Sequence, residues 1–274
     1  MFRLIATLLA SMAMFLASCS WMFVQQYRSG SSSSLVEFLY PDGEVPPPVD
    51  GHIPVIKVPA RVGIAFVPGH GNLALTEAEQ NQLLGQVRDA FMGRDYVERI
   101  EVIPSTYLRG KKGFDSLAQV GRLYSVDLMA LVSYDQVVTT GETASSILYW
   151  TIVGAYTIRG NENEVTTFVD TAVFDLNTQR MLFRAPGLDE ASKRSTAVAV
   201  GQVSRELSEG SFEVAMQQMT TNLDSELERF RERIKVDQSV RVVSRSGGEG
   251  SVDLLLLLGL CAGLLWVGRS TRQG

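Results

Sequence analysis

The amino-acid sequence predicts an α/β (α+β) fold with a mixed sheet, in which a βαβαβ first half is followed by antiparallel hairpins and a long C-terminal helix. Three observations lead to this prediction. Between Arg61 and Tyr134, apolar runs of strand length alternate with amphipathic stretches, an order typical of parallel or mixed sheets. Between Val165 and Arg184, two strand-like runs flank a turn. From Ser211 to Lys235, apolar residues recur every three or four positions, and we expect the folded domain to span residues 61–236.

The first half carries signals for three strands and two helices. The run RVGIAFV at Arg61–Val67 predicts a buried strand, which the following Pro-Gly pair ends. The next helix begins at Thr76-x-x-Glu79, a capping box in which each of the two side chains satisfies a backbone amide. We then expect a strand exposed on one face, a helix opened by a second capping box, and another buried strand, at Val97–Ile103, Ser116–Gln119 and Asp127–Tyr134 respectively.

The second half is antiparallel in character. Residues 146–158 are rich in β-branched and aromatic side chains, and Val165–Leu176 alternates apolar and polar positions. Asn177-Thr178 predicts a turn, Arg180–Arg184 predicts the returning strand, and the chain is expected to be helical after Pro186. The apolar stripe of the last helix should pack on the sheet, and its members are Phe212, Met216, Met219, Leu223, Leu227, Phe230 and Ile234. A coiled-coil partner is the weaker alternative, because the stripe covers only about three heptads.

The N-terminus has the pattern of an export signal. Arg3 precedes an apolar stretch, and residues 1–18 read as a signal peptide. The residues Leu16-Ala17-Ser18-Cys19 resemble the bacterial lipobox, and the resemblance implies recognition of Leu16, Ala17 and Ser18 by a signal peptidase and lipid attachment at Cys19. Two or more acyl chains hold a protein stably on a membrane. A plain signal peptide, or an N-terminal anchor with a chance cysteine, is the alternative.

Residues 19–60 are predicted to be a lipidated Ser/Pro-rich tether. Gly30–Ser34 is expected to be flexible, and six of the nine prolines fall between Pro41 and Pro59, a composition that favours extended polyproline II structure. Within this tether, Leu35–Tyr40 could form a short helix or strand that docks on the domain.

The C-terminus combines a Gly/Ser linker at residues 237–251, an uncharged apolar stretch and a short basic tail at 269–274. A helix over 252–268 would rise about 25 Å, slightly less than a hydrocarbon core of about 30 Å, and is predicted to be transmembrane with a cytoplasmic tail. Gly247, Gly248, Gly250 and Ser251 before this stretch resemble the GlyGly-CTERM sorting motif. The resemblance implies cleavage by a rhombosortase-type intramembrane protease, whereas an ordinary C-terminal anchor is the alternative.

Together, the two terminal motifs and the Ser-rich segment that ends in Leu39-Tyr40-Pro41 resemble the rhombotarget lipoprotein family. The resemblance implies a Gram-negative envelope lipoprotein, on the periplasmic or surface side of the outer membrane, whose C-terminal helix lies at least transiently in the inner membrane. The implied partners are lipoprotein-processing enzymes, a rhombosortase-type protease and membrane lipid. The order of elements also looks like the α/β domains of the curli-secretion lipoprotein family, a fold-level analogy.

Composition argues against several chemistries. With 25 basic and 30 acidic residues and no basic patch, no nucleic-acid partner is expected. Neither His52, in the tether, nor His70, in a loop interpreted as a plain turn, has a nucleophile elbow or a metal-ligand cluster around it, so we expect no cofactor, metal or catalytic residue. The sequence therefore predicts a non-enzymatic envelope lipoprotein. A binding or assembly module, as a homo-oligomer or with an envelope protein partner, is one alternative, and a hydrolase that uses His70 is another.

Overall fold

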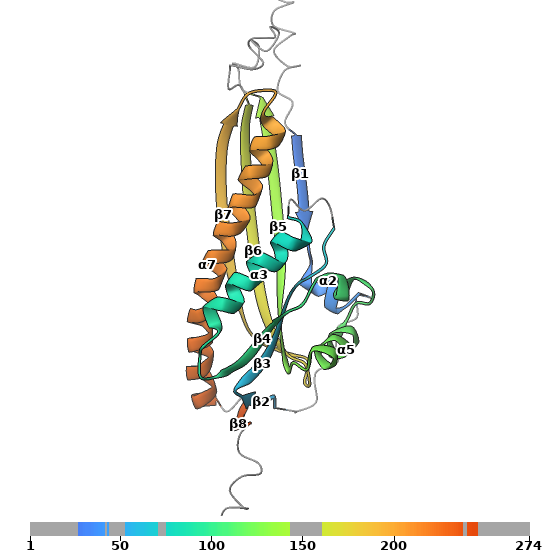
Figure 1. Ribbon diagram of the computed structural model, residues 1–274, viewed down its shortest axis with the longest axis vertical. Coiled ribbons are helices and arrows are strands. Elements are labelled where there is room, and N and C mark those ends of the chain that lie inside the picture. Colours follow the sequence, from blue (N-terminus) through green and yellow to red (C-terminus); the bar gives the residue numbers. More distant parts are fainter. Residues whose placement is uncertain are drawn as a thin grey trace, which may run out of the picture.

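The computed structural model describes residues 27–41, 43, 53–70, 75–142, 161–237 and 240–245 (Figure 1). Its strands are β1 (Tyr27–Ser32), β2 (Val55–Val58), β3 (Ala60–Phe66), β4 (Val97–Val102), β5 (Leu128–Glu142), β6 (Asn161–Asp175), β7 (Arg180–Ser195) and β8 (Arg241–Ser244). Its helices are α2 (Leu35–Leu39), α3 (Glu77–Phe91), α4 (Thr106–Arg109), α5 (Phe114–Tyr124) and α7 (Val200–Asp237). The predicted mixed sheet with a long C-terminal helix is therefore confirmed.

The six-stranded sheet has the order β4-β3-β5-β6-β7, with β1 added alongside β5, and β2 and β8 form a separate two-stranded ribbon. β3 lies parallel to both β4 and β5, and β5, β6 and β7 form an antiparallel meander. The predicted βαβαβ order and the antiparallel second half are both present. Residues 146–158, for which a strand was expected, lie outside the described residues.

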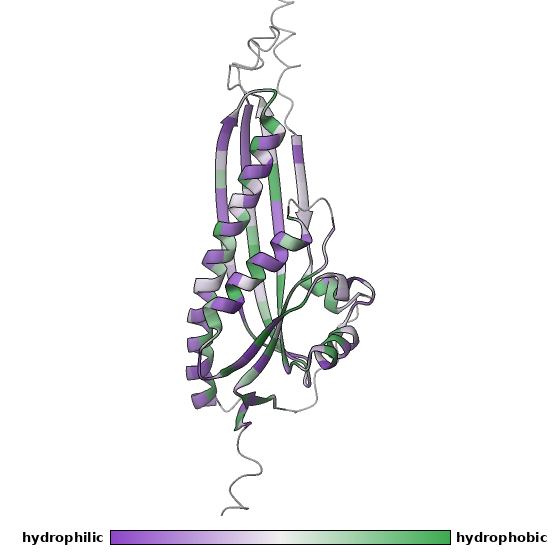
Figure 2. Cartoon of the chain, viewed as in Figure 1, coloured by the Kyte–Doolittle hydropathy of each residue, from purple (hydrophilic) through white to green (hydrophobic). Residues whose placement is uncertain are grey.

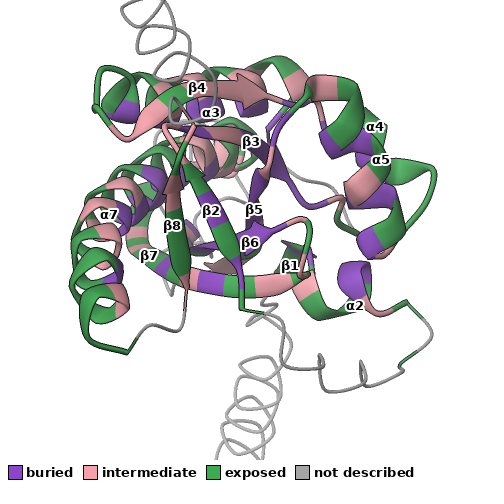
Figure 3. Cartoon of the chain, turned by 90° about the horizontal axis from the view of Figure 1, so that it is seen from below, coloured by how far each residue is buried: buried purple, intermediate pink, exposed green. Residues whose placement is uncertain are grey.

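Two apolar cores cover the two faces of the sheet. The helices α3 and α7 bury one face, while α2, α4 and α5 bury the other (Figure 3). The capping box of α3 is confirmed: Thr76 and Glu79 each accept from the other's backbone amide. The second predicted box is wrong, because α5 begins at Phe114 and Ser116 is buried inside it. The earlier start places the Phe114 ring between those of Tyr40 and Phe174, with centroids 5.8 and 5.7 Å away.

The strand β7 continues through Pro186 to Ser195, where a helix was predicted. Proline is tolerated there because β7 is an edge strand, so its missing amide costs no ladder hydrogen bond. The carbonyl of Pro186 instead accepts from the Asn222 side chain of α7, at 2.7 Å. The turn before β7 is the predicted one, and the Asp175 carboxylate fixes it by accepting from the Thr178 amide at 3.0 Å.

The helix α7 packs along the sheet through the predicted apolar stripe, and it starts at Val200 rather than soon after Pro186 as predicted. Hydrophilic residues predominate on its outward side, most clearly over its lower half (Figure 2). The contact with β7 is very close at Gly187, where an added Cβ would lie 2.1 Å from the carbonyl oxygen of Ala215. Only glycine fits at this crossing.

The folded body extends beyond the predicted boundaries at both ends. The expected tether at residues 19–60 contributes β1, α2 and β2, and the expected linker at 237–251 contributes β8. The segment predicted to be flexible, Gly30–Ser34, pairs with β5 through Ser32, and Phe38 and Leu39 of α2 are buried in the core. The docked helix was the alternative considered for Leu35–Tyr40. The short strands lack the length of a clear sequence signal, and each is fixed by pairing with a distant part of the chain.

Candidate functional site

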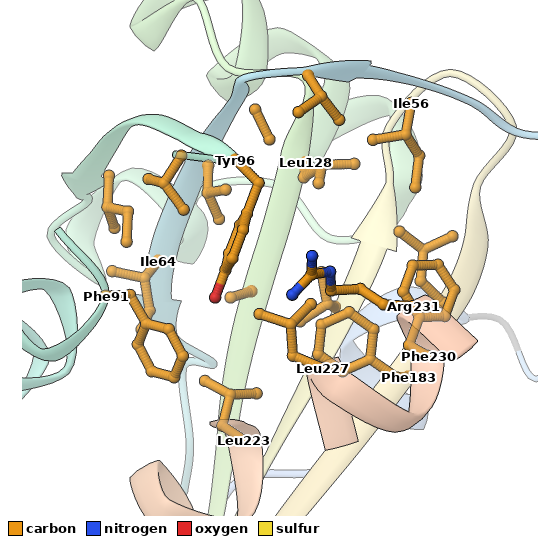
Figure 4. A pocket seen from close by; sticks show the side chains of 18 of the residues that line it. Ile56, Ile64, Phe91, Tyr96, Leu128, Phe183, Leu223, Leu227, Phe230 and Arg231 are labelled. Atoms are coloured by element: carbon orange, nitrogen blue, oxygen red, sulfur yellow. The ribbon is translucent and has the colours of Figure 1, made fainter. Parts of the chain in front are cut away.

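A cavity of about 380 Å³ lies between the sheet and the C-terminal half of α7, which is its lower half in Figure 1. The α3–β4 corner closes one side of it and the β2–β8 ribbon closes its end. This volume falls within the range of about 300–1,000 Å³ that is usual for small-molecule sites. The walls are overwhelmingly apolar, and they include Ile56, Ile64, Phe91, Leu128, Phe183, Leu223, Leu227 and Phe230 (Figure 4).

The cavity exists because small and branched side chains on the strands face widely spaced large ones on α7. Val62, Ala130 and Val173 form the floor contributed by the sheet. On the opposite side, the Phe230 ring packs against the Phe183 ring with centroids 5.1 Å apart, and both side chains line the cavity. Such a hollow forfeits dispersion contacts that a packed core would make.

The lining also includes three polar residues, Asp95, Tyr96 and Arg231, and the Arg231 side chain is 45% exposed. The Cζ atom of Arg231 lies 5.1 Å from the centroid of the Tyr96 ring, a stacked cation–π arrangement (Figure 4). Arg231 also donates to Glu228 at 2.8 Å. The Tyr96 hydroxyl is buried and has no hydrogen-bond partner among the described residues. Burial raises the pKa of Tyr96 above its ordinary value, so this phenol stays neutral at physiological pH.

The β2–β8 ribbon acts as the end wall of the pocket through Ile56, Val58 and Val242. Its closing contact is Arg245, directly after β8, whose side chain is only 20% exposed. The Arg245 guanidinium lies 3.1 Å from the Glu98 carboxylate, donates to the Pro59 carbonyl at 3.1 Å and pairs with Asp127. The C-terminal strand is therefore held on the domain by charge-assisted hydrogen bonds.

The α3–β4 corner is fixed to α7 by a second ion pair. Arg94 donates to Asp224 at 3.0 Å, so the loop that carries Tyr96 and the helix that carries Arg231 are joined across the side of the pocket. Both side chains of this pair are 44% exposed, and the pair positions the corner more than it stabilises the fold.

Neither His70, the candidate base of the alternative hydrolase function, nor the buried Asp170 and Asp175 forms part of a second site. The imidazole of His70 is 73% exposed and 3.9 Å from Glu37, and its backbone pairs with Ser32 in an isolated bridge. Asp170 pairs with Arg184 at 3.2 Å, whereas Asp175 holds the β6–β7 turn. Within the described ranges, no group of three or more His, Cys, Asp or Glu side chains is placed to hold a metal ion.

The site residues predicted at the two ends of the chain lie outside the described residues. They are Leu16, Ala17, Ser18 and Cys19 at one end and Gly247, Gly248, Gly250 and Ser251 at the other. The predicted transmembrane helix at 252–268 lies outside them as well. Of the helices that the structure describes, none is long and apolar enough to cross a membrane.

The pocket itself was not predicted. The sequence predicted only a packing stripe for Leu223, Leu227, Phe230 and Ile234. It gave no signal for Tyr96, which precedes the strand predicted at Val97–Ile103. The one sequence signal is the continuation of the stripe to Ile234. That signal becomes a site only when the strands opposite are known to carry small residues.

No family model and no curated protein matches the chain. Among solved structures, it is similar to a homolog of neuraminyllactose-binding hemagglutinin from Helicobacter pylori, at 13% identity, 72% of this chain, 97% of that chain and a TM-score of 0.36. It is also similar to the PelC dodecamer from Paraburkholderia phytofirmans, at 7% identity, 71% of this chain, 99% of that chain and a TM-score of 0.25. Lipoprotein GNA1162 from Neisseria meningitidis matches at 11% identity, 53% of this chain, 92% of that chain and a TM-score of 0.25. At such TM-scores, these likenesses support no inference about ligand or activity.

Proposed function

We propose that this protein is a non-enzymatic envelope lipoprotein whose folded domain binds an apolar ligand in the pocket beneath α7. The observation that carries the binding role is the partly open apolar cavity of about 380 Å³. A concave, mostly apolar site with a few convergent polar groups is the usual form of a small-molecule site. Membrane attachment rests on the sequence, in which Cys19 follows Leu16-Ala17-Ser18 as in a lipobox.

Processing of the C-terminus by a rhombosortase-type protease belongs to the same proposal, and the Gly247–Ser251 motif supports it. Because Arg245 is tied to Asp127, Glu98 and Pro59, the motif begins two residues beyond a fixed point of the domain. In this proposal, Cys19 fixes the protein to the outer membrane and cleavage releases it from the inner one. The homo-oligomer and the envelope protein partner stay predictions.

Photolabelling of the full-length chain in native membranes tests the binding role. The probe is a long-chain hydrocarbon with a diazirine in mid-chain, and mass spectrometry locates the labelled residues. We expect label on pocket residues such as Phe91 and Leu227. The variant Leu227→Trp fills the cavity and should reduce this labelling at least fivefold. Ile234→Trp repeats the test from the other end of the lower half of α7.

Val214→Trp is the matched control, because Val214 lies on the same helix and is 48% exposed. Its labelling of the pocket should equal that of the unchanged chain. Absence of pocket labelling in the unchanged chain would overturn the binding role. Intact mass spectrometry tests the anchors separately: Cys19→Ala should abolish lipidation, and removal of the protease should preserve the mass of the C-terminal segment. A normal lipidated mass in Cys19→Ala would contradict the anchor.

A further inference from the structure

The Tyr96 hydroxyl is the most informative polar atom in the pocket. It is buried, and no described residue offers it a hydrogen-bond partner. Buried hydroxyls nearly always have a partner, because leaving one unpaired forfeits the hydrogen bonds it would make with water. The charged groups nearby do not fill this role. Arg94 is paired with Asp224 and Arg231 with Glu228, Asp95 is exposed, and no hydrogen bond joins any of them to the Tyr96 hydroxyl.

An ordered water is a poor substitute for a partner here. A buried water makes about three hydrogen bonds to protein groups, and genuinely apolar cavities stay dry. Figure 4 shows the Tyr96 side chain extending into the pocket, with its hydroxyl on the side where Phe91, Leu223 and Leu227 lie. These side chains offer no hydrogen bonds, so the missing partner fits an atom of a ligand better than a solvent molecule.

The side chains of Tyr96 and Arg231 specify which kind of atom this is. A guanidinium has five N–H donors and no acceptor, and a neutral phenol can donate. Arg231 uses Nη1 for Glu228 and stacks on the Tyr96 ring. Two donors from different elements therefore lie side by side at one wall of a largely apolar pocket. The Asp95 carboxylate in the same lining can only accept hydrogen bonds, so the two donors favour an oxygen acceptor supplied by the ligand.

The rest of the pocket specifies what is attached to that oxygen. The walls formed by Phe183, Leu227 and Phe230 and the end wall formed by Ile56 and Val242 are hydrocarbon. About 380 Å³ lies near the lower end of the range for small-molecule sites, which suits one chain rather than two.

We propose that the pocket binds a single-chain amphiphile, with its acyl chain between α7 and the sheet and its carboxylate or ester carbonyl oxygen accepting from the Tyr96 hydroxyl. This inference rests on the proposed binding function and adds the ligand class. Arg231 is its positioning residue, since it stacks on the phenol ring and provides positive charge beside the acceptor.

The test compares two probes on the full-length chain in native membranes. One is a long-chain fatty acid with a mid-chain diazirine, and the other is the hydrocarbon probe of the same length without the carboxyl group. Both should label pocket residues in the unchanged chain. Tyr96→Phe keeps the ring and removes the donor, so it should reduce labelling by the acid about three- to tenfold and leave labelling by the hydrocarbon unchanged. Tyr107→Phe is the matched control, because Tyr107 is half-exposed and belongs to α4, far from the pocket lining.

The outcomes separate the two levels of the proposal. If the hydrocarbon labels the pocket and Tyr96→Phe leaves labelling by the acid unchanged, the ligand class is overturned and apolar binding stands. If neither probe labels the pocket, the proposed function fails as well. Competition by unlabelled fatty acid or by a monoacyl phospholipid supports the class and tells the two sources apart. Competition by neither overturns it.

Discussion

The contact between α7 and the sheet has two halves of opposite character. In the upper half, Ser204 and Ser211 of α7 meet Asn163 and Thr167 of β6 in a network of hydrogen bonds at 2.8–3.0 Å. Gln136 of β5 joins the same network through Thr167 and the Ser208 carbonyl. In the lower half, the same helix presents Leu223, Leu227, Phe230 and Ile234 to a cavity. Its hydrogen bonds to the sheet there, from Asn222 and Arg233, go to carbonyls of the edge strand β7 and not to the strands beneath the cavity.

One helix therefore serves two purposes. Hydrogen bonds are directional, so the upper half fixes the position of α7 along the strands. Apolar contacts are not directional, and a loosely packed apolar half can accept a ligand without unpairing any polar group. Because the upper half holds the helix in place, the lower half can stay hollow. Substitutions at Gly187 and Thr167 test the fixed part, and substitutions at Arg245 and Tyr96 test the hollow part.

The largest effect should come from the junction between the halves. Gly187→Ala places a Cβ 2.1 Å from the Ala215 carbonyl oxygen and 2.7 Å from the Met219 amide nitrogen, both backbone atoms of α7. The helix must move away from β7, and we expect the free energy of unfolding to fall by about 3 kcal/mol. Urea denaturation of the full chain measures it. Gly210→Ala is the control, because nothing lies within 4 Å of its Cβ position and alanine should stabilise the helix by about 0.5–1 kcal/mol.

In the upper half, Thr167→Val keeps the shape of the side chain and removes an acceptor that serves both Gln136 and Ser211 at 2.8 Å. Two buried donors lose a partner, so we expect a loss of about 2 kcal/mol in the free energy of unfolding. Thr166→Val on the exposed face of the same strand should change it by less than about 0.5 kcal/mol. Equal effects of the two substitutions would show that the network does not fix the helix.

The two halves also differ in how much of their structure could be predicted from the sequence. The stripe from Phe212 to Ile234 has a helical period, so the helix and its apolar side are predictable from the sequence alone. The upper network is not, because Ser204 and Asn163 are ordinary surface residue types until the fold brings them together. The same holds for the pocket: Tyr96 and Arg231 are 135 positions apart, and only the packing of α7 on the sheet makes them neighbours. The terminal motifs are the reverse case, because enzymes read them as short sequences.

At the end of the lower half, Arg245→Met should loosen the ribbon that closes the pocket. The change leaves Asp127 and Glu98 without their shared cation and removes the donor to the Pro59 carbonyl. We expect a local effect of about 1 kcal/mol, since these groups are partly exposed. Hydrogen exchange should show faster opening of the β2 and β8 amides, with β5 and β6 unchanged. Slower exchange in the ribbon, or an equal change in the meander, would contradict a local closing role.

The smallest expected effect is a difference between the two halves in how the free energy of unfolding depends on pH. The pKa of Tyr96 is raised above the ordinary value of 10 mainly by burial, so the unfolded chain loses this proton first as the pH rises. The stability that the neutral phenol contributes is complete below pH 10 and is lost as the pH rises through the folded-state pKa. The free energy of unfolding of Tyr96→Phe should therefore fall less steeply than that of the unchanged chain above pH 10.

Thr167→Val supplies the contrast, since Gln136, Asn163, Thr167 and Ser211 carry no titratable group. The free energy of unfolding of Thr167→Val should be lower than that of the unchanged chain by the same amount at pH 8 and pH 10.5, as measured by urea denaturation at both values. Bound amphiphile should enlarge the pH dependence attributed to Tyr96, because ionisation removes the proton that the ligand oxygen accepts. A Tyr96→Phe curve parallel to that of the unchanged chain would mean that this hydroxyl is hydrated rather than held in an apolar pocket.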